Sequence, residues 1–377
     1  MSNRSFPPPR FVFMEVNKRC NLRCTHCDFW QRDDSEKSKY LTIDQKREIL
    51  TEFAALNPKG NLVICGGEPM LDFNDYFELA AAARERGLNI LSVVNGTRIR
   101  RPEVAEKMIN EGPHEISISL NSHVPELHDE TRGVKGAFDK ATKALRLLVD
   151  AKKRLGAENT RIYVMGLIFA RNYKLIDGFY DFVLNDIGAD QLKLNFIQPS
   201  FGHLGDVDPF FANESGVDGD ELEGILKDCN EKYSLGLNPA WMGQTGMYFR
   251  SLKKISPETI ERGWAAGIGT DEHICNTYER NIMIDHYGTA RLCFSHAFPG
   301  KKLENSGDLT DFWTKSSAIR ARMRKCNQFC GISHSVRRES STLKGRAKLD
   351  AHLKEHGDVP PPSLLTEAVE GFKALVR

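Results

Sequence analysis

A regular alternation of two apolar patterns over residues 10–200 constrains the fold of this chain more than any other feature. Short runs rich in β-branched or aromatic residues end in polar or turn residues, as strands do. Longer amphipathic patterns between them are typical of helices. Such alternation predicts a parallel sheet with crossover helices, covered on both faces or closed as a barrel. The predicted strands are 10–16, 61–69, 89–97, 114–122, 161–169 and 191–199, and the predicted helices are 41–56, 76–87, 102–112, 137–156 and 173–188.

The pattern changes after residue 200. The Gly- and Asp-rich stretch 201–220 predicts a long loop, and 221–266 predicts one helix followed by a weakly patterned connection. From residue 275 onward two short runs flank a turn at 286–288, which indicates a hairpin. The last 37 residues have a helical pattern that three prolines interrupt at 360–362.

Composition excludes several classes of protein. Hydrophobic residues make up 40% and charged residues 27%, which suits a chain with a sizeable core and excludes a disordered or fibrous one. The formal charge of +1 gives no global field for nucleic acid or an anionic membrane, so neither is an expected partner. No apolar run approaches the roughly 18 residues of a spanning helix, and the start of the chain lacks the features of a signal peptide. We therefore predict a soluble, cytoplasmic protein.

Nine cysteines in a chain of this kind are expected to be metal ligands or catalytic groups rather than disulfides. Cys20, Cys24 and Cys27 lie within eight residues, directly after the first predicted strand. Thiolates ligate iron–sulfur clusters and structural zinc. A fourth local ligand is missing apart from His26, so the spacing favours an iron–sulfur cluster with one open iron. The alternative is a zinc knuckle completed by His26 or a distant cysteine.

This CX3CX2C spacing after the first strand of a predicted (β/α) barrel resembles the radical S-adenosylmethionine enzymes. The resemblance implies a [4Fe–4S] cluster on the three cysteines, with the amino and carboxylate groups of S-adenosylmethionine on its open iron. It also implies reductive cleavage of that cofactor to a 5′-deoxyadenosyl radical, which abstracts a substrate hydrogen. The protein would place the substrate and exclude water, because the cofactor supplies the chemistry. The resemblance covers about residues 10–200.

The turn after the second strand supports this resemblance. Gly66, Gly67, Glu68 and Pro69 are similar to the family's GGEP motif, whose backbone and carboxylate hold the methionine amino group. Glycines let a backbone approach a ligand closely, and a carboxylate pairs with an ammonium group. An ordinary strand-to-helix turn is the alternative interpretation of these four residues.

Polar residues after the third and fourth strands extend the predicted cofactor site. Asn95 ends the third strand, where the family's ribose contacts often lie. Ser119 and Asn121 resemble the family's SLDG-like stretch, with Asn121 in the place of a common Asp. Arg132 resembles the family's Arg-Gly and could bind the cofactor carboxylate bidentately, or it could be a surface charge near a helix end. All these candidates follow the C-terminal ends of strands, where barrel active sites are built.

Four later cysteines form a second candidate site. The spacing from Cys275 through Gly288 to Cys293 is similar to the opening of SPASM and Twitch auxiliary-cluster domains, with the glycine permitting a hairpin turn. Together with Cys326 and Cys330 these thiols suit one auxiliary [4Fe–4S] cluster, and a four-cysteine zinc ribbon is the alternative. No ligand role is assigned to Cys65 or Cys229, and we expect them to have a packing role.

The predicted organisation is a partial (β/α)6 barrel of the TIM type followed by a small hairpin-containing iron–sulfur domain. The barrel spans 10–215, a helical and loop connection 216–269, the Twitch/SPASM-like auxiliary-cluster domain 270–335 and a helical C-terminal tail 336–377. An α/β fold class follows from this organisation.

The predicted function is hydrogen abstraction from a small polyhydroxylated metabolite such as a sugar, aminocyclitol or nucleotide sugar. The outcome could be oxidation, epimerisation, dehydration or decarboxylation, with an external one-electron donor such as flavodoxin or ferredoxin. Radical maturation of a ribosomal peptide is the alternative, less favoured because the nineteen residues before Cys20 hold no winged-helix leader-binding domain. A non-enzymatic electron carrier or a zinc-stabilised binding module is the alternative of another class. The substrate-contact candidates are Arg171, Asn172, Asn195, Gln198, Ser200, His203 and Tyr248, and for each of them a solvated loop residue is the favoured alternative.

Overall fold

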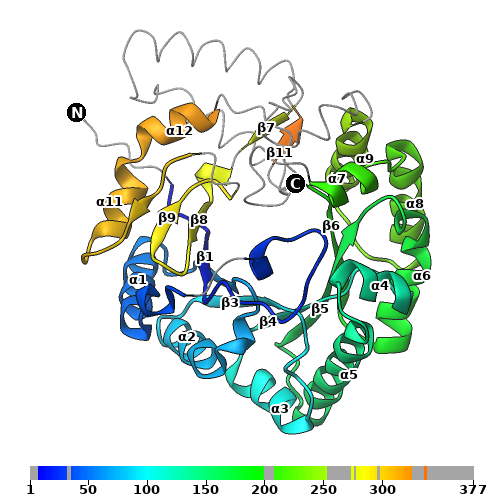
Figure 1. Cartoon of the computed structure of the whole chain (residues 1–377), viewed down its shortest axis with the longest axis horizontal. Helices are drawn as coiled ribbons and strands as arrows, with labels where there is room; N and C mark the ends of the chain where they lie inside the picture. Colours follow the sequence, from blue (N-terminus) through cyan, green and yellow to red (C-terminus); the bar gives the residue numbers. More distant parts are fainter. Residues whose placement is uncertain are drawn as a thin grey trace.

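The structure is a computed structural model. It describes residues 7–31, 35–198, 208–252, 273–275, 277–294, 298–324 and 335–337. In Figure 1 an outer arc of helices surrounds the strands, and the chain runs around this arc from blue to green.

Six parallel strands lie side by side in chain order, as the alternating pattern predicts. Each strand pairs with the next through a helical crossover, which is the connection that parallel strands require. The result is an α/β fold in the form of a partial barrel (Figure 1). The strands are β1 (Phe11–Glu15), β2 (Asn61–Cys65), β3 (Asn89–Val94), β4 (Glu115–Ser119), β5 (Arg161–Ile168) and β6 (Gln191–Phe196).

The crossover helices also follow the predicted pattern. The first begins at an N-cap Thr42 whose hydroxyl accepts the Gln45 N–H, while the Gln45 side chain accepts from the cap backbone. This reciprocal capping box satisfies two of the free donors at the helix start. The short helix α4 (Pro125–Arg132), with few apolar residues, was not predicted. The crossover elements are α1 (Ile43–Leu56), η3 (Pro69–Leu71), α2 (Phe73–Glu85), α3 (Pro102–Glu111), α5 (Ala137–Leu155), η4 (Tyr173–Leu175), α6 (Ile176–Asp181) and the π-helical η5 (Phe182–Ile187).

The barrel strands have one face under the helices and one face turned inward. On β1, Val12 and Met14 are fully buried in the main hydrophobic core, which includes the helices. Side chains alternate along a strand, so Phe13 lies on the opposite face, where its ring contacts Phe294 at 4.7 Å between centroids. We call the face that bears Phe13 the inner face. Side chains there can reach the interior of the barrel.

The predicted hairpin joins the barrel sheet. Its strands are β8 (Asn281–Ile284) and β9 (Thr289–Arg291), and Gly288 supplies the left-handed turn conformation with φ of 87°. β8 pairs in parallel with β1 and extends the sheet past its first strand, and β10 (Lys301–Lys302) follows on the far side of β9. Sequence analysis assigned this hairpin to a separate domain. In the structure β8 and β1 form one sheet.

Beyond β6 the helical content exceeds the prediction. The predicted loop 201–220 is wrong over its second part, because α7 (Pro209–Glu214) begins there at an N-cap Asp208. The described residues 219–252 contain two helices, where the sequence pattern predicts one over 221–266. No helix in the described part of the chain is long and apolar enough to cross a membrane. The predicted tail 336–377 lies outside the described residues except for two positions of β11. The remaining elements are η1 (Phe29–Gln31), η2 (Lys37–Lys39), α8 (Gly219–Lys232), α9 (Pro239–Leu252), β7 (His273–Cys275), η7 (Thr277–Glu279), α11 (Asp308–Lys315), α12 (Ser317–Arg324) and β11 (Ser335–Arg337).

Candidate active site around the cysteine loop

The loop that follows β1 brings three thiols together. Cys24 is buried and Cys20 and Cys27 are partly exposed, and all three pack in one small apolar cluster around Leu22 and Ala137. Burial, together with a smaller effect of the neighbouring Cys24, raises the pKa of Cys20 to about 11 and that of Cys27 to about 12. A positive centre bound by the thiols would reverse this effect, because a coordinating thiol is deprotonated.

The turn after β2 holds the loop on one side. The backbone N–H of Gly67 donates to the Asn17 carbonyl at 2.9 Å, and that of Glu68 donates to the Arg19 carbonyl at 2.6 Å. A Cβ atom on Gly67 would lie 2.0 Å from the Arg19 carbonyl oxygen, and Gly66 has a φ of +134°. Side chains larger than hydrogen therefore do not fit at either position.

The end of α4 holds the loop on the other side. Arg23 N–H donates to the Arg132 carbonyl and Thr25 N–H to the Thr131 carbonyl, each at 3.0 Å. Gly133 has a left-handed φ of +63°, and a Cβ atom there would lie 2.2 Å from the Arg23 carbonyl oxygen. The cysteine loop is thus clamped between two glycine turns that come from different crossovers.

Glu68 connects the ends of two strands. Its Oε1 accepts the Met70 N–H at 3.1 Å, and its Oε2 accepts the Asn95 N–H at 2.7 Å. The side chain is almost fully buried, and desolvation raises its pKa to about 7. In this structure Glu68 therefore has a structural role in addition to the predicted contact with an ammonium group. That contact remains a prediction.

The raised pKa of Glu68 gives a pH-dependent stability. The folded protein keeps the proton up to about pH 7, whereas the unfolded chain releases it near the ordinary pKa of a glutamate side chain, 4.5. The stabilising contribution of Glu68 is therefore complete below the unfolded pKa and is lost as the pH rises through the folded pKa. We expect the stability of wild type relative to Glu68→Gln to fall between about pH 5 and about pH 8, measured by urea unfolding of the metal-free protein. A difference that does not vary with pH would contradict the assignment.

Asn95 joins the cysteine loop to the end of β3. Its amide nitrogen donates to Asn21 Oδ1 at 2.9 Å, and its carbonyl oxygen accepts from the Thr97 hydroxyl at 2.7 Å. The Asn21 amide in turn donates to the Thr97 hydroxyl at 2.8 Å, which closes a ring of hydrogen bonds. The predicted ribose-contact residue therefore also fixes the orientation of the loop that carries Cys20.

Arg132 lies beside Cys24, and Asn121 holds its guanidinium. Arg132 Nη1 is 3.7 Å from Cys24 Sγ, and Nη2 donates to Asn121 Oδ1 at 3.1 Å. Arg132 Nε is buried and has no partner among the described residues. A buried guanidinium with a free donor next to a cysteine fits a bound carboxylate. Ser119 ends β4 on the inner face, paired in register with Met165.

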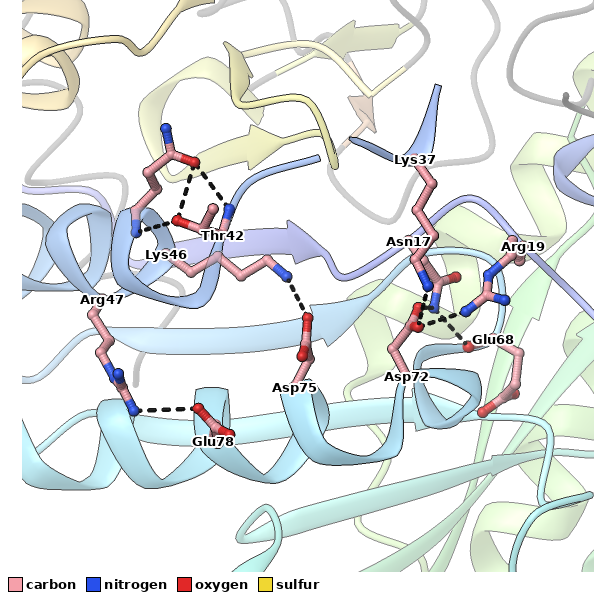
Figure 2. A network of polar contacts seen from close by, with 11 residues as sticks. Asn17, Arg19, Lys37, Thr42, Lys46, Arg47, Glu68, Asp72, Asp75 and Glu78 are labelled. Atoms are coloured by element: carbon pink, nitrogen blue, oxygen red, sulfur yellow. Dashed lines mark hydrogen bonds and ion pairs between the residues drawn. The ribbon is translucent and has the colours of Figure 1, made fainter. Parts of the chain in front are cut away.

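Asp72 is a hub that sequence analysis did not identify (Figure 2). Its carboxylate accepts from Asn17 Nδ2 at 2.8 Å, from Arg19 and from Lys37 Nζ at 3.1 Å. Asn17 Nδ2 also donates to the Glu68 carbonyl at 3.1 Å. One carboxylate at the start of α2 therefore holds the end of β1, the residue before Cys20 and the segment that leads into α1. An acidic residue three positions after a GGEP-like turn is the signal that could have suggested it.

We expect Asp72→Asn to destabilise the protein by about 1–3 kcal/mol, because the amide cannot replace both acceptor oxygens. The exposed Lys37 contributes little to this loss, since surface ion pairs are weak. Chemical denaturation measures the change. Asp44→Asn is the matched control, because Asp44 is exposed and its one ion pair within the described residues is with Arg47 in the same helix. We expect a loss of less than about 0.5 kcal/mol there. Equal losses of stability for the two substitutions would refute the proposed role of Asp72 in holding these segments together.

Several predicted substrate contacts have structural partners instead. Arg171 forms ion pairs with Glu130 and Glu214. Asn172 donates to the Asn121 carbonyl at 2.8 Å and accepts the Phe169 N–H at 2.8 Å. These two side chains support the loop after β5, and their partners leave them little capacity for a substrate.

The remaining predicted contacts differ in accessibility. Asn195 is exposed on β6, and its amide lies 3.3 Å from the sulfur of Met165. Gln198 has a buried Oε1 without a partner among the described residues. Tyr248 is buried and donates to the Ile197 carbonyl at 2.6 Å. Ser200 and His203 lie outside the described residues. Asn195 and Gln198 are therefore the predicted contacts that stay open to a ligand.

The second cysteine group is described only in part. Cys293 is partly exposed after β9, and the backbone of Cys275 ends β7, which pairs with β11. Cys326 and Cys330 lie outside the described residues. The auxiliary site thus stays a prediction. Within the described ranges, which include Cys20, Cys24 and Cys27, no three His, Cys, Asp or Glu side chains are grouped around a single metal ion. The thiolates of a [4Fe–4S] cluster each bind a different iron, so a cluster does not require that grouping.

Comparison with known proteins agrees with this geometry. The model of the radical SAM superfamily matches residues 14–170. The AdoMet-dependent heme synthase of Methanosarcina barkeri is 34% identical over 140 residues, which are 37% of this chain and 39% of that protein. Mycofactocin maturase MftC of Mycobacterium tuberculosis is 32% identical over 199 residues, 52% of this chain and 47% of that protein. The chain thus spans less than half the length of these curated relatives.

Solved structures share the fold. Streptococcus suis SuiB bound to S-adenosylmethionine superposes with a TM-score of 0.57 at 15% identity, over 87% of this chain and 70% of that one. anSMEcpe with bound AdoMet and the Cp18Cys peptide gives a TM-score of 0.54 at 16% identity, over 87% and 89%. At these identities the likeness concerns the fold alone. The three clustered thiols and the two glycine turns lie within the segment that the family model matches, so residues 14–170 are similar to the radical SAM superfamily.

Proposed function

We propose that this protein is a radical SAM enzyme that cleaves S-adenosylmethionine reductively and abstracts hydrogen from a small substrate. The observation that carries the proposal is the clamped loop, which holds Cys20, Cys24 and Cys27 at the C-terminal face of the strands. A [4Fe–4S] cluster and S-adenosylmethionine bound there would supply the electron and the 5′-deoxyadenosyl radical.

The chain's own residues would bind and orient the cofactor. Arg132 has a buried donor available for a carboxylate, and the inward position of Asn121 keeps that guanidinium in place. Glu68 offers a carboxylate with one lone pair of each oxygen still unused, suited to an ammonium group. The apolar cluster around Leu22 and Ala137 excludes water from one side of the thiols. As the resemblance implies, the residues close to the cofactor would also include Gly66, Gly67 and Asn95.

The substrate class is the finer part of the proposal. We favour a small polyhydroxylated metabolite, because the inner face of the barrel carries polar side chains such as Ser119 and Asn195 among apolar ones. The names of the relatives favour neither class, since they include both a heme synthase and a peptide maturase. Maturation of a ribosomal peptide therefore stays the second candidate. An auxiliary [4Fe–4S] cluster on Cys275, Cys293, Cys326 and Cys330, and an external donor such as flavodoxin or ferredoxin, belong to the same proposal.

Anaerobic incubation with S-adenosylmethionine and dithionite tests the proposal, with 5′-deoxyadenosine measured by chromatography. We expect slow formation of 5′-deoxyadenosine even without substrate, and faster formation when a substrate is supplied. Intact clusters without any 5′-deoxyadenosine would favour a non-enzymatic electron carrier, and zinc in place of iron would favour a binding module. A carrier would have no need of the buried donor on Arg132 beside Cys24.

A further inference from the structure

A buried carboxylate and imidazole form a pair outside the cofactor site described above. Glu15, the last residue of β1, is 1% exposed, and His286, in the turn after β8, is 4% exposed. Glu15 Oε2 and His286 Nδ1 are 2.7 Å apart, although the two residues are separated by 271 positions in the chain. The pairing of β8 with β1 is what brings them together.

The pair lies toward the interior of the barrel. Glu15 follows Phe13 by two positions and so shares its inner face. Cys65 is opposite Glu15 in the β1–β2 register, and burial followed by the charge of Glu15 raises the pKa of its thiol. Cys65 is nevertheless partly exposed, so accessible space adjoins the buried carboxylate.

Each member of the pair has one atom without a partner. Glu15 Oε1 and His286 Nε2 are both buried and make no hydrogen bond within the described residues. If Nδ1 carries the proton that binds the carboxylate, then Nε2 is an acceptor, as is Oε1. Buried polar groups in folded proteins are nearly always hydrogen-bonded, so two unpartnered acceptors on the same ion pair call for a ligand that donates.

The surroundings restrict the chemistry of that ligand. The rings of Tyr40 and Tyr287 lie 4.8 and 4.2 Å from the His286 ring. The ammonium group of Lys18 donates to the Tyr287 hydroxyl at 2.8 Å, so this cation already has a partner on one of the two tyrosines. A carboxylate with a free oxygen repels phosphates and carboxylates at close range. Neutral or cationic donors are therefore favoured over anions.

We propose that Glu15 and His286 form a substrate subsite that binds a hydroxyl or amino group on a saturated carbon skeleton. The subsite rests on the proposed function and deepens it, since such groups are what a polyol or amino-polyol presents. Two separate acceptors match two donor groups, such as hydroxyl or amino groups at different positions of one skeleton.

Alkylation of Cys65 tests the proposal, because this partly exposed thiol lies beside Glu15. The reconstituted full-length protein with S-adenosylmethionine is treated anaerobically with N-ethylmaleimide, and labelling of Cys65 is followed by peptide mass spectrometry. The probes are myo-inositol and D-glucosamine. We expect at least one of them to slow labelling about tenfold when its free concentration is about ten times its Kd. Hexa-O-methyl-myo-inositol, which has no donor hydrogens, should not protect.

Variants locate the effect. Protection should disappear in Glu15→Gln and in His286→Gln and should persist in Glu115→Gln. The control makes the same carboxylate-to-amide change at the other end of the inner face, where Glu115 pairs with Lys193 at 3.1 Å. The ratio of rates with and without probe is compared within each variant, because removing the Glu15 charge alters the thiol itself. The comparison of methylated and free inositol needs no variant, so misfolding of a variant cannot hide the answer.

The outcomes separate the subsite from the enzyme. The subsite would be overturned if neither probe protects Cys65, if the methylated inositol protects equally, or if protection survives both Glu15→Gln and His286→Gln. Loss of stability in these two variants without protection in wild type would also overturn it, because that result indicates a structural water. Formation of 5′-deoxyadenosine in the same preparation is measured independently. If 5′-deoxyadenosine forms but Cys65 is not protected, only the subsite is refuted. If Cys65 is protected but no 5′-deoxyadenosine forms, the proposed function is refuted and the subsite stands.

Discussion

Replacing Cys20, Cys24 and Cys27 together with alanine should abolish 5′-deoxyadenosine formation and remove about four irons per chain. The three thiols lie in one apolar cluster on a loop whose backbone is held at both ends, and the remaining members of that cluster, Leu22, Val134 and Ala137, have no ligand atoms in their side chains. Iron, labile sulfide and zinc are measured after anaerobic reconstitution. Wild type should contain about eight irons if the second cysteine group also holds a cluster.

The controls for this measurement are the two cysteines without a predicted ligand role. Cys65 lies on the inner face of β2, and Cys229 is buried in α8 within the main core. The double variant Cys65→Ala/Cys229→Ala should keep the wild-type iron content. Unchanged iron in the triple variant would refute the site. About four irons in wild type and almost none in the triple variant would remove the auxiliary cluster, and accompanying zinc would make the later cysteines a structural ribbon.

Gly67→Ala should be the most damaging single substitution in the site. The new Cβ would meet the Arg19 carbonyl oxygen at 2.0 Å, and that carbonyl belongs to the backbone just before Cys20. Backbone cannot rotate away as a flexible side chain can, so the loop must shift. We expect a loss of about 3 kcal/mol in stability, poor cluster incorporation and little 5′-deoxyadenosine. Thermal unfolding, iron content and product formation measure these three effects.

Gly224→Ala is the matched control for this substitution. Gly224 lies inside α8, and a Cβ atom there would meet nothing within 4 Å. The same chemical change should stabilise that helix by up to about 1 kcal/mol, because alanine has the higher helix propensity. A Gly67→Ala protein with wild-type iron content and product yield would mean that the turn does not clamp the loop.

Periodicity allowed the barrel to be predicted and also explains what was missed. The six strands are apolar on the helix-facing side and bounded by turn residues, so their pattern is visible in the chain itself. α4 and α7 are short, with eight and six residues, and α7 adjoins a Gly- and Asp-rich stretch. α9 contains Gly243 and Gly246, which weaken a helical pattern. Packing against α8, where Gly246 allows close approach to Gly219, compensates for that weakness.

The sequence by itself determined the parts of this protein whose residues are neighbours in the chain. The three cysteines and the glycines after β2 are such parts, because local spacing decides which ligands one loop can offer. Only the tertiary structure showed that Gly67 and Gly133 clamp this loop, that Asp72 ties Asn17 to Arg19, and that β8 joins β1. These contacts link positions tens to hundreds of residues apart, as in the 271-residue separation of Glu15 and His286. Their geometry depends on which strands become neighbours, and strand order is decided by packing of the whole sheet rather than by any local pattern.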